Sequence, residues 1–337
     1  MVGRLIRGTP AADSLAGSDG DEALFGFDGD DTLDGGGGRD FVSGDGGADA
    51  LRGGDGDDLI VGGAGNDTVE GDRSAADTFP DLEPGTGNDT VFGGDGDDLL
   101  FAGKGDDFVS GGGGDDLAQG GAGADTVLGG GGDDRVLGGP RLSVFDASGP
   151  GNPDDGPDLL RGGDGQDSVV GGHGRDTLLG ERGDDTLRGG YGADTLSGGE
   201  GEDLFAFGTV EPAPFPSTRA FIDTGLGGDA DLVLDFRQGE DRIDLSTINS
   251  YSVRFVGTGD FAFDFIGTEA FSGERPEVRY DIVGNRTVVQ LDGVAPVFSS
   301  STGPGVPAVV VVPTDGAADA EIVLAGRVAL QESDFLV

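Results

Sequence analysis

The chain has 337 residues, of which 72 are glycine and only 35% are hydrophobic, so it holds too little apolar material for one large core. Its formal net charge of −45 disfavours nucleic acid and anionic membrane surfaces as partners and favours cations. The chain has no cysteine and a single histidine, His173, which excludes disulfides, thiolate metal sites and HExxH zinc chemistry.

Residues 1–7 form a short lead-in that lacks the apolar run of a secretory signal peptide. No stretch of the chain approaches the length of a membrane span, so none is predicted.

From residue 8 the chain repeats a nine-residue unit, G-G-x-G-x-D-x-U-x, in which U is a large apolar residue. GGDGDDLIV at 53–61 and GGAGNDTVE at 62–70 are neighbouring examples. Nineteen units fall into three blocks, 8–70, 84–137 and 153–206, separated by insertions at 71–83 and 138–152. A period this regular predicts a repeat architecture.

The sixth position of every unit is acidic, and these residues are the candidate metal ligands. They are Asp13, Glu22, Asp31, Asp40, Asp49, Asp58, Asp67, Asp89, Asp98, Asp107, Asp116, Asp125, Asp134, Asp158, Asp167, Asp176, Asp185, Asp194 and Asp203.

Glycines before this acid permit positive φ and let backbone carbonyls converge, and the acid adds a charged oxygen. An oxygen-only set in a flexible loop favours Ca²⁺ over Mg²⁺ and over softer metals. The candidate carbonyl ligands are the glycines at the second and fourth positions of six units: Gly54, Gly56, Gly63, Gly65, Gly94, Gly96, Gly112, Gly114, Gly163, Gly165, Gly172 and Gly174.

The last three residues of each unit, with the apolar one in the middle, predict a very short strand whose centre points inward. Two units then make one flattened turn, and each unit stacks on the second unit after it at roughly 4.8 Å. If one Ca²⁺ lies between each pair of stacked turns, the number of ions depends on the insertions. The chain holds about 13 ions if the insertions separate the blocks, and about 17 if they loop out of one continuous roll. Because the apolar side chains alone do not offset the backbone entropy, we expect the repeats to be largely disordered without Ca²⁺.

The units GGDGDDLIV, GGAGNDTVE, GGDGDDLLF and GGHGRDTLL closely resemble those of the RTX (repeats-in-toxin) family of Gram-negative secreted proteins. The resemblance implies an all-β fold, a parallel β-roll or nonapeptide-repeat solenoid, with Ca²⁺ held by the sixth-position acid and by glycine carbonyls. Three departures from the pattern are Glu22, Ala102 at a first position and Glu181 at a second position.

Residues 207–337 carry no repeat, and their alternating apolar and polar residues predict strands. They resemble the C-terminal module of serralysin-type proteases, which implies a β-sandwich-like domain continuing the roll. The final Asp334-Phe335-Leu336-Val337 is similar to that family's uncleaved signal for type I secretion.

The repeats begin at about Gly8, which leaves no room for a catalytic domain before them, and the initial Met favours a stand-alone protein. The leading hypothesis is a non-enzymatic, secreted, extracellular Ca²⁺-binding protein. It would be exported by a type I apparatus, fold outside on Ca²⁺, and serve a structural, matrix or surface role. One alternative is the secretion and calcium-binding portion of a hydrolase such as a serralysin-like metalloprotease, and a second is a carbohydrate-binding adhesin that contacts extracellular polysaccharide or cell-surface matrix.

His173, at a variable third position, is expected to be a solvated loop side chain. The fifth-position acids, such as Asp57, Asp97 and Asp106, are expected to be solvated charges, with cation capture as the alternative. The two insertions are expected to be surface loops, with a ligand-contact role as the alternative.

Overall fold

The computed structural model describes residues 4–72, 87–139, 156–207, 231–245, 264–267, 277–283, 286–292, 297–298, 310–311, 320–325 and 328–336. Lead-in residues 1–3, most of the two insertions, much of the expected C-terminal domain and Val337 lie outside the described residues.

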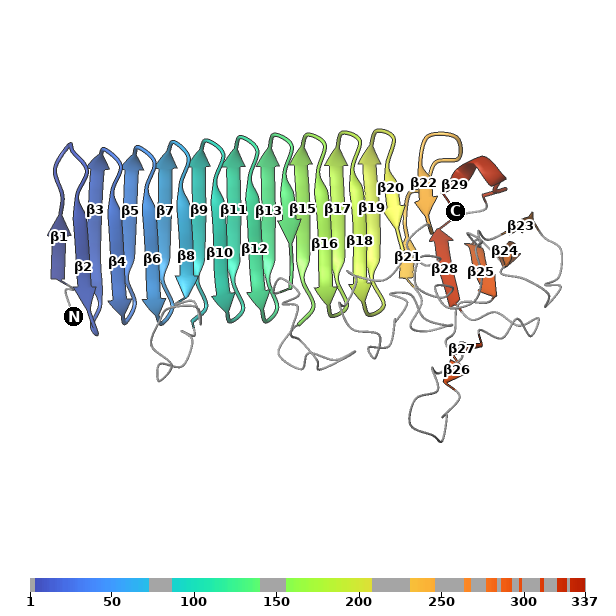
Figure 1. Cartoon of the computed structure of the whole chain (residues 1–337), viewed down its shortest axis with the longest axis horizontal. Helices are drawn as coiled ribbons and strands as arrows, with labels where there is room; N and C mark the ends of the chain where they lie inside the picture. The colour runs from blue at the N-terminus through green and yellow to red at the C-terminus, as the bar shows by residue number, and fades with distance from the viewer. Residues whose placement is uncertain are drawn as a thin grey trace, which may run out of the picture.

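The described repeats form a parallel β-solenoid built from two facing sheets (Figure 1). The first 22 strands alternate between the sheets, odd-numbered strands in one and even-numbered strands in the other. The odd strands are β1 (Arg4–Arg7), β3 (Glu22–Asp28), β5 (Phe41–Gly46), β7 (Leu59–Ala64), β9 (Thr90–Asp95), β11 (Phe108–Gly113), β13 (Thr126–Gly131), β15 (Leu159–Asp164), β17 (Thr177–Arg182), β19 (Thr195–Glu200) and β21 (Asp231–Val233). The even strands are β2 (Ser14–Ser18), β4 (Thr32–Gly37), β6 (Ala50–Asp55), β8 (Thr68–Asp72), β10 (Leu99–Lys104), β12 (Leu117–Ala122), β14 (Arg135–Leu137), β16 (Ser168–His173), β18 (Thr186–Tyr191), β20 (Leu204–Ala206) and β22 (Arg242–Asp244).

The register confirms that each unit stacks on the second unit after it. Thr32 of β4 pairs with Ala50 of β6, and Leu33 pairs with Leu51. Most strands are six residues long, because they continue through the first three positions of the following unit. The predicted three-residue strand was therefore too short.

The interior is filled by the apolar side chains of the eighth positions, which point inward from both sheets, as predicted. Within the described units after the first, these residues are at most 3% exposed. On the odd strands they are Leu24, Val42, Ile60, Val91, Val109, Val127, Leu160, Leu178 and Leu196, and on the even strands Leu33, Leu51, Val69, Leu100, Ala118, Val136, Val169, Leu187 and Phe205. From Gly26 on, the first-position glycines are also buried, so the two sheets approach each other with little apolar volume between them.

Both sheets continue without a break across the two insertions. Strand β7 pairs with β9, and β8 pairs with β10, just as β13 pairs with β15 and β14 with β16. Gly71 and Gly138, which the sequence analysis assigned to the insertions, belong to the solenoid. Each insertion therefore interrupts a turn within a unit, and both interruptions fall between an even and an odd strand, at the same edge of the solenoid.

The sheets also extend beyond residue 206, where the recognisable repeat ends. Strand β21 pairs with β19, and β22 pairs with β20. Strand β28 (Ala320–Ala325) then joins β21, followed by β25 (Arg286–Asp292), β24 (Glu277–Val283) and β23 (Asp264–Gly267) in the same sheet. Strand β29 (Phe335–Leu336) joins β22 after a short 3-10 helix at Glu332–Asp334, and β26 (Val297–Phe298) pairs with β27 (Val310–Val311).

This C-terminal part differs from the repeats in how it is packed. Its pairs β24–β25 and β25–β28 are antiparallel, whereas the described strands of the repeats, such as β4 and β6, pair in parallel. Its core includes large side chains such as Phe207, Phe236, Leu245 and Phe335. The solenoid thus ends on a broader apolar core than any repeat supplies.

Candidate metal sites along the solenoid edges

The sixth-position carboxylates form two continuous rows, one along each edge of the solenoid, which we call the Asp13 ladder and the Glu22 ladder. In each ladder the backbone amide of one member donates a hydrogen bond to Oδ1 of the next, at 2.7–3.2 Å. The Asp13 ladder runs through Asp31, Asp49, Asp67, Asp98, Asp116, Asp134, Asp167, Asp185, Asp203 and Asp241. The Glu22 ladder runs through Asp40, Asp58, Asp89, Asp107, Asp125, Asp158, Asp176, Asp194 and Asp231.

The second oxygen of these carboxylates is buried, and within the described residues many accept no hydrogen bond. This holds for Oδ2 of Asp31, Asp40, Asp49, Asp67, Asp98, Asp116, Asp125, Asp134, Asp167, Asp185 and Asp194. Leaving a buried charged oxygen without a partner is costly, and a bound cation is the usual compensation.

Burial raises the pKa of these carboxyl groups, while the hydrogen bond from the preceding amide opposes the shift. The pKa rises to about 6 for Asp40, Asp98, Asp116, Asp125, Asp167, Asp194 and Asp203, and to about 7 for Asp67, Asp134 and Asp185. Metal-free ladders therefore carry their charge at a cost in free energy, and a cation bound beside them would reverse the shift.

The first-position glycine leaves room for the carboxylate oxygen. A methyl group on Gly129 would lie 2.5 Å from Oδ2 of Asp134 and 2.5 Å from the carbonyl oxygen of Gly162. Both oxygens thus face the same α-carbon, and a side chain there would fill the space between them.

The predicted carbonyl ligands are also stacked between turns. A methyl group on Gly114 would clash with the carbonyl oxygen of Gly96, and one on Gly112 would clash with that of Gly94. The carbonyl oxygens of Gly56, Gly63, Gly65, Gly165, Gly172 and Gly174 lie in the same way against a glycine of the stacked unit. Gly54 and Gly163 pair in register with Asp72 and Glu181, which take the second position of the stacked unit in place of glycine.

These oxygens fit a hard cation such as Ca²⁺, which accepts carboxylates and carbonyls in irregular geometry. Among the described residues no group of three or more acidic or histidine side chains is placed so that it could hold a metal ion by itself. Any site would therefore combine few carboxylates with several backbone oxygens. The residues that would hold the ion are the sixth-position acids and the glycines of two stacked turns.

At the N-terminal end of the ladders, the carboxylates are bound by the protein itself. Oδ2 of Asp13 accepts hydrogen bonds from the amide and the hydroxyl of Thr9, and the carboxylate of Glu22 accepts them from the amide and hydroxyl of Ser18. The first turn of each ladder thus differs from the interior turns.

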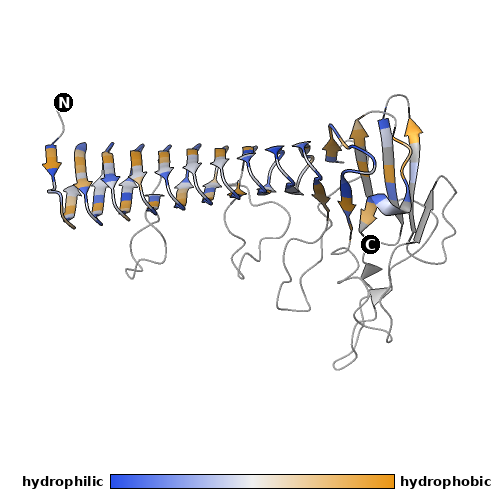
Figure 2. Ribbon diagram, turned by 90° about the horizontal axis from the view of Figure 1, so that it is seen from above, coloured by the Kyte–Doolittle hydropathy of each residue, from blue (hydrophilic) through white to orange (hydrophobic). Residues whose placement is uncertain are grey.

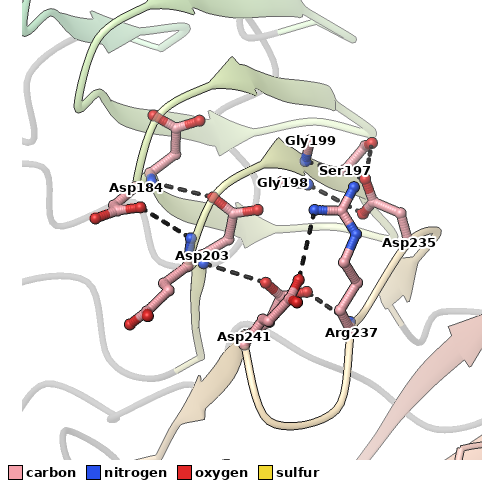
Figure 3. A network of polar contacts seen from close by, with 11 residues as sticks. Asp184, Ser197, Gly198, Gly199, Asp203, Asp235, Arg237 and Asp241 are labelled. Atoms are coloured by element: carbon pink, nitrogen blue, oxygen red, sulfur yellow. Dashed lines mark hydrogen bonds and ion pairs between the residues drawn. The ribbon is translucent and has the colours of Figure 1, made fainter.

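The C-terminal end of the Asp13 ladder is shown in Figure 3. Oδ1 of Asp241 accepts from the amide of Asp203, and Oδ2 accepts from the amide of Arg237 at 2.6 Å. Nearby, Asp235 accepts hydrogen bonds from the hydroxyl of Ser197 and the amides of Gly198 and Gly199. Protein donors therefore bind the acids of this last turn.

Sequence reasoning missed Asp231 and Asp241, the last members of the ladders. For Asp241 the signal was present, since Gly239, Asp241 and Ile243 keep the fourth, sixth and eighth positions of the unit. Asp231 and Val233 keep the sixth and eighth positions and Gly227 keeps the second, but Asp229 replaces the fourth-position glycine that nearly every other unit has.

The departures from the repeat are accommodated in different ways. Asp107 keeps its place in the Glu22 ladder although its unit begins with Ala102. Three second positions that are not glycine adopt positive φ, with φ of 82° at Phe27, 76° at Asp45 and 85° at Glu181. Such values strain a residue with a Cβ atom.

The fifth-position side chains also form hydrogen bonds between stacked units, and these bonds are exposed. Here the amide of the later unit donates to the side chain of the earlier unit, which is the reverse of the direction in the ladders. Oδ1 of Asp97 accepts from the amide of Asp115, and Oδ1 of Asp57 and Asp106 accept from Asn88 and Ala124. These acids are solvated as expected, and they also tie successive turns together. The expectation for His173 was wrong, since it lies on β16 and is only 8% exposed.

The family model of the RTX calcium-binding nonapeptide repeat matches residues 7–42, 43–75, 84–118, 110–140, 154–187 and 179–209. None of the curated proteins compared with the chain is similar enough to count as a match.

Two solved structures are similar to parts of the chain, both subunits of the Azotobacter vinelandii mannuronan C5-epimerase. The AlgE6R3 subunit is 30% identical, with 54% of this chain and 78% of that chain covered and a TM-score of 0.31. The AlgE6R2 subunit is 22% identical, with 62% and 90% covered and a TM-score of 0.28.

The described residues contain no helix long and apolar enough to cross a membrane. RTX repeats bind calcium and are typical of secreted proteins. With stacked nonapeptide units matched over more than half of its length, this chain belongs to the family of RTX calcium-binding nonapeptide-repeat proteins.

Proposed function

We propose that this chain is a non-enzymatic, secreted protein whose solenoid folds on binding Ca²⁺ outside the cell. Its role there is structural, as part of an extracellular matrix or a cell surface. Export occurs through a type I apparatus before the repeats fold.

The buried Oδ2 atoms of the ladders support this proposal most directly. Eleven of them have no hydrogen-bond donor among the described residues, and beside eight of these a glycine carbonyl of the stacked turn faces the same first-position α-carbon. At roughly 1 mM Ca²⁺ and a Kd near 10⁻⁴ M, each site adds about 1.4 kcal/mol, and at sub-micromolar Ca²⁺ it adds almost nothing. The ion concentration would therefore decide whether the solenoid is folded.

The continuous pairing of strands across both insertions favours the larger of the two ion counts. One site per stacked pair of repeat units gives about 17, and the stacking of Asp231 and Asp241 would raise this to about 19.

The burial of the proposed secretion signal in the folded protein is consistent with export of an unfolded chain. Asp334 and Phe335 are buried in the folded protein, and Phe335 pairs with Ile243 of β22. A transporter could reach this segment only before the C-terminal part folds.

Far-ultraviolet circular dichroism of the full chain in EGTA, titrated with Ca²⁺ and separately with Mg²⁺, tests the proposal. A cooperative transition from coil to β at millimolar or lower Ca²⁺, absent with Mg²⁺, is expected. A β spectrum that is already complete in EGTA would overturn the calcium-dependent part of the proposal.

A further inference from the structure

The two edges of the solenoid differ in the charges that surround the ladders. Turns from odd to even strands carry the Asp13 ladder and form the upper edge in Figure 1, which we call the Asp13 edge. Turns from even to odd strands carry the Glu22 ladder and form the lower edge, the Glu22 edge. Figure 2 looks onto the Asp13 edge, with the two sheets as rows of strands. Both ladders consist of aspartate after Glu22, so a difference in their affinity for cations would come from the residues around them.

On the Asp13 edge, exposed acids accompany the ladder in every turn that ends at a sixth position from Asp98 to Asp203. These acids are Asp95, Asp97, Asp115, Asp133, Asp164, Glu181, Asp184, Glu200 and Glu202. The only base in the same turns is Arg182, and it forms an exposed ion pair with Asp164 at 2.9 Å. Each of these turns therefore adds at least one exposed carboxylate to the buried one.

On the Glu22 edge, the turns that end at sixth positions from Asp107 to Asp194 lack such acids. The described residues of these turns are 102–106, 120–124, 138–139, 156–157, 171–175 and 189–193. Asp106 is the only acid among them, and it shares its turn with the exposed Lys104. Arg175 adds a second exposed base. The described part of this edge thus offers a cation little beyond the ladder itself.

Backbone hydrogen bonds hold the fifth-position acids in place next to the ladder. Oδ1 of Asp97 accepts from the amide of Asp115, and Oδ1 of Asp115 accepts from the amide of Asp133, both at 2.9 Å. Asp184 accepts from the amide of Glu202 in the same way (Figure 3). The charge of each acid therefore stays beside the ladder residue that follows it in the chain.

The exposed charges act on the buried carboxylates. Burial is the largest cause of the raised pKa of Asp116, and the charges of Asp97 and Asp115 raise this pKa further. Burial also raises the pKa of Asp194 on the other edge, but there the charge of Arg175 lowers it. A surrounding charge that disfavours a carboxylate favours a cation at the same place. The Asp13 edge therefore attracts Ca²⁺ more strongly.

The size of the effect follows from exposed ion pairs, which change an equilibrium by about two- to fivefold each. Acids of neighbouring turns lie one strand spacing away, at about 4.8 Å, so more than one acts on each site of the Asp13 edge. Together they give a difference of about tenfold between the edges at low salt, since ligand charge is one of the properties that tune Ca²⁺ affinity.

We propose that these exposed acids make the Asp13 edge the high-affinity edge for Ca²⁺, and that the turns of the Glu22 edge from Asp107 to Asp194 form a weaker class of about five sites. The weaker sites fill only after the rest of the solenoid has bound its ions and folded. This inference rests on Ca²⁺ binding by the turns, which the proposed function also requires, but not on export or on an extracellular role.

Equilibrium dialysis of the full chain against radiolabelled Ca²⁺ at low ionic strength tests this proposal, with circular dichroism recorded at the same free Ca²⁺ concentrations. After the β signal is complete, the chain should take up about five further ions with a Kd about tenfold higher. Added KCl should bring the two classes of sites closer together, because it screens exposed charges.

Two variants assign the classes to the edges. Asp115→Asn with Asp133→Asn removes two charges from the Asp13 edge and keeps the side-chain acceptors, since Asn66 and Asn88 accept the same bond at other fifth positions. It should weaken the tight class by about two- to fivefold and leave the weak class unchanged. The reciprocal variant, Ala124→Asp with Ala193→Asp, should strengthen only the weak class.

Circular dichroism in saturating Ca²⁺ checks that both variants fold. If all ions bind in a single class as the β signal appears, or if each variant shifts both classes equally, the inference is wrong, while Ca²⁺-dependent folding still stands. A chain that binds no Ca²⁺ would overturn both the inference and the proposed function.

Discussion

The backbone amide of Asp40 donates a hydrogen bond of 2.8 Å to Oδ1 of Asp58, which belongs to the unit stacked on it. Throughout both ladders, one carboxylate oxygen thus holds two turns together. The other oxygen remains buried, facing the glycines of its own turn. The same side chain can therefore bind the next turn and a cation at once.

Replacing Asp98 by Asn should separate these two roles. The amide oxygen can still accept from the backbone of Asp67, while an NH₂ group replaces the buried Oδ2. We expect a higher Ca²⁺ midpoint in the circular dichroism titration and a loss of about 1–3 kcal/mol in the free energy of unfolding at saturating Ca²⁺.

Asp13→Asn is the matched control, because Thr9 already binds Oδ2 of Asp13 and no earlier turn donates to it. The substituted side chain can keep these bonds through its amide oxygen. An equal shift of the Ca²⁺ midpoint in both variants would show that the buried oxygen has no special part in ion binding.

The repeat itself made much of this arrangement predictable. The period of nine fixes which residues stack, and the apolar eighth positions, such as Ile60, point inward as expected. The ladder hydrogen bonds were not predictable, because they depend on which of two carboxylate oxygens faces the neighbouring turn. Asp231 escaped notice because stacking, and not the glycine pattern, places it in the ladder.

Gly129→Ala should be strongly destabilising, because its methyl group would meet Oδ2 of Asp134 and the carbonyl oxygen of Gly162. Overpacking of this kind costs about 1–3 kcal/mol. Gly131→Ala, in the same unit, should be neutral or slightly stabilising, since nothing lies within 4 Å of the added methyl group. Thermal unfolding in saturating Ca²⁺ measures both, and similar melting temperatures would contradict the packing found here.

Glu181→Gly should stabilise the protein, because a residue with φ of 85° is strained unless it is glycine. The substitution also removes the exposed ion pair with Arg161, in which the two charged atoms lie 3.2 Å apart. Such a pair contributes about 0–1 kcal/mol, less than the strain of about 1–3 kcal/mol. Arg161→Ala removes the ion pair alone, so Glu181→Gly should melt above it and above the wild type. A lower melting temperature than that of Arg161→Ala would refute the strain.

Acid should partly replace Ca²⁺ in folding the solenoid. Burial raises the pKa of Asp67, Asp134 and Asp185 from 3.8 to about 7, so the folded metal-free chain binds more protons than the unfolded chain between these values. Stability from this source is fully present below pH 3.8 and is lost as the pH rises through about 7. In metal-free buffer, the β signal should therefore increase as the pH is lowered from about 7.5 to 5.

Lowering the pH also reduces general repulsion among the surface carboxylates, so salt provides the control. Added KCl at pH 7.5 screens exposed charges, but it does not reach the buried Oδ2 atoms. We expect KCl to leave the metal-free chain unfolded. Folding by salt alone, or no response to acid, would mean that the buried carboxylates are not what prevents the metal-free solenoid from folding.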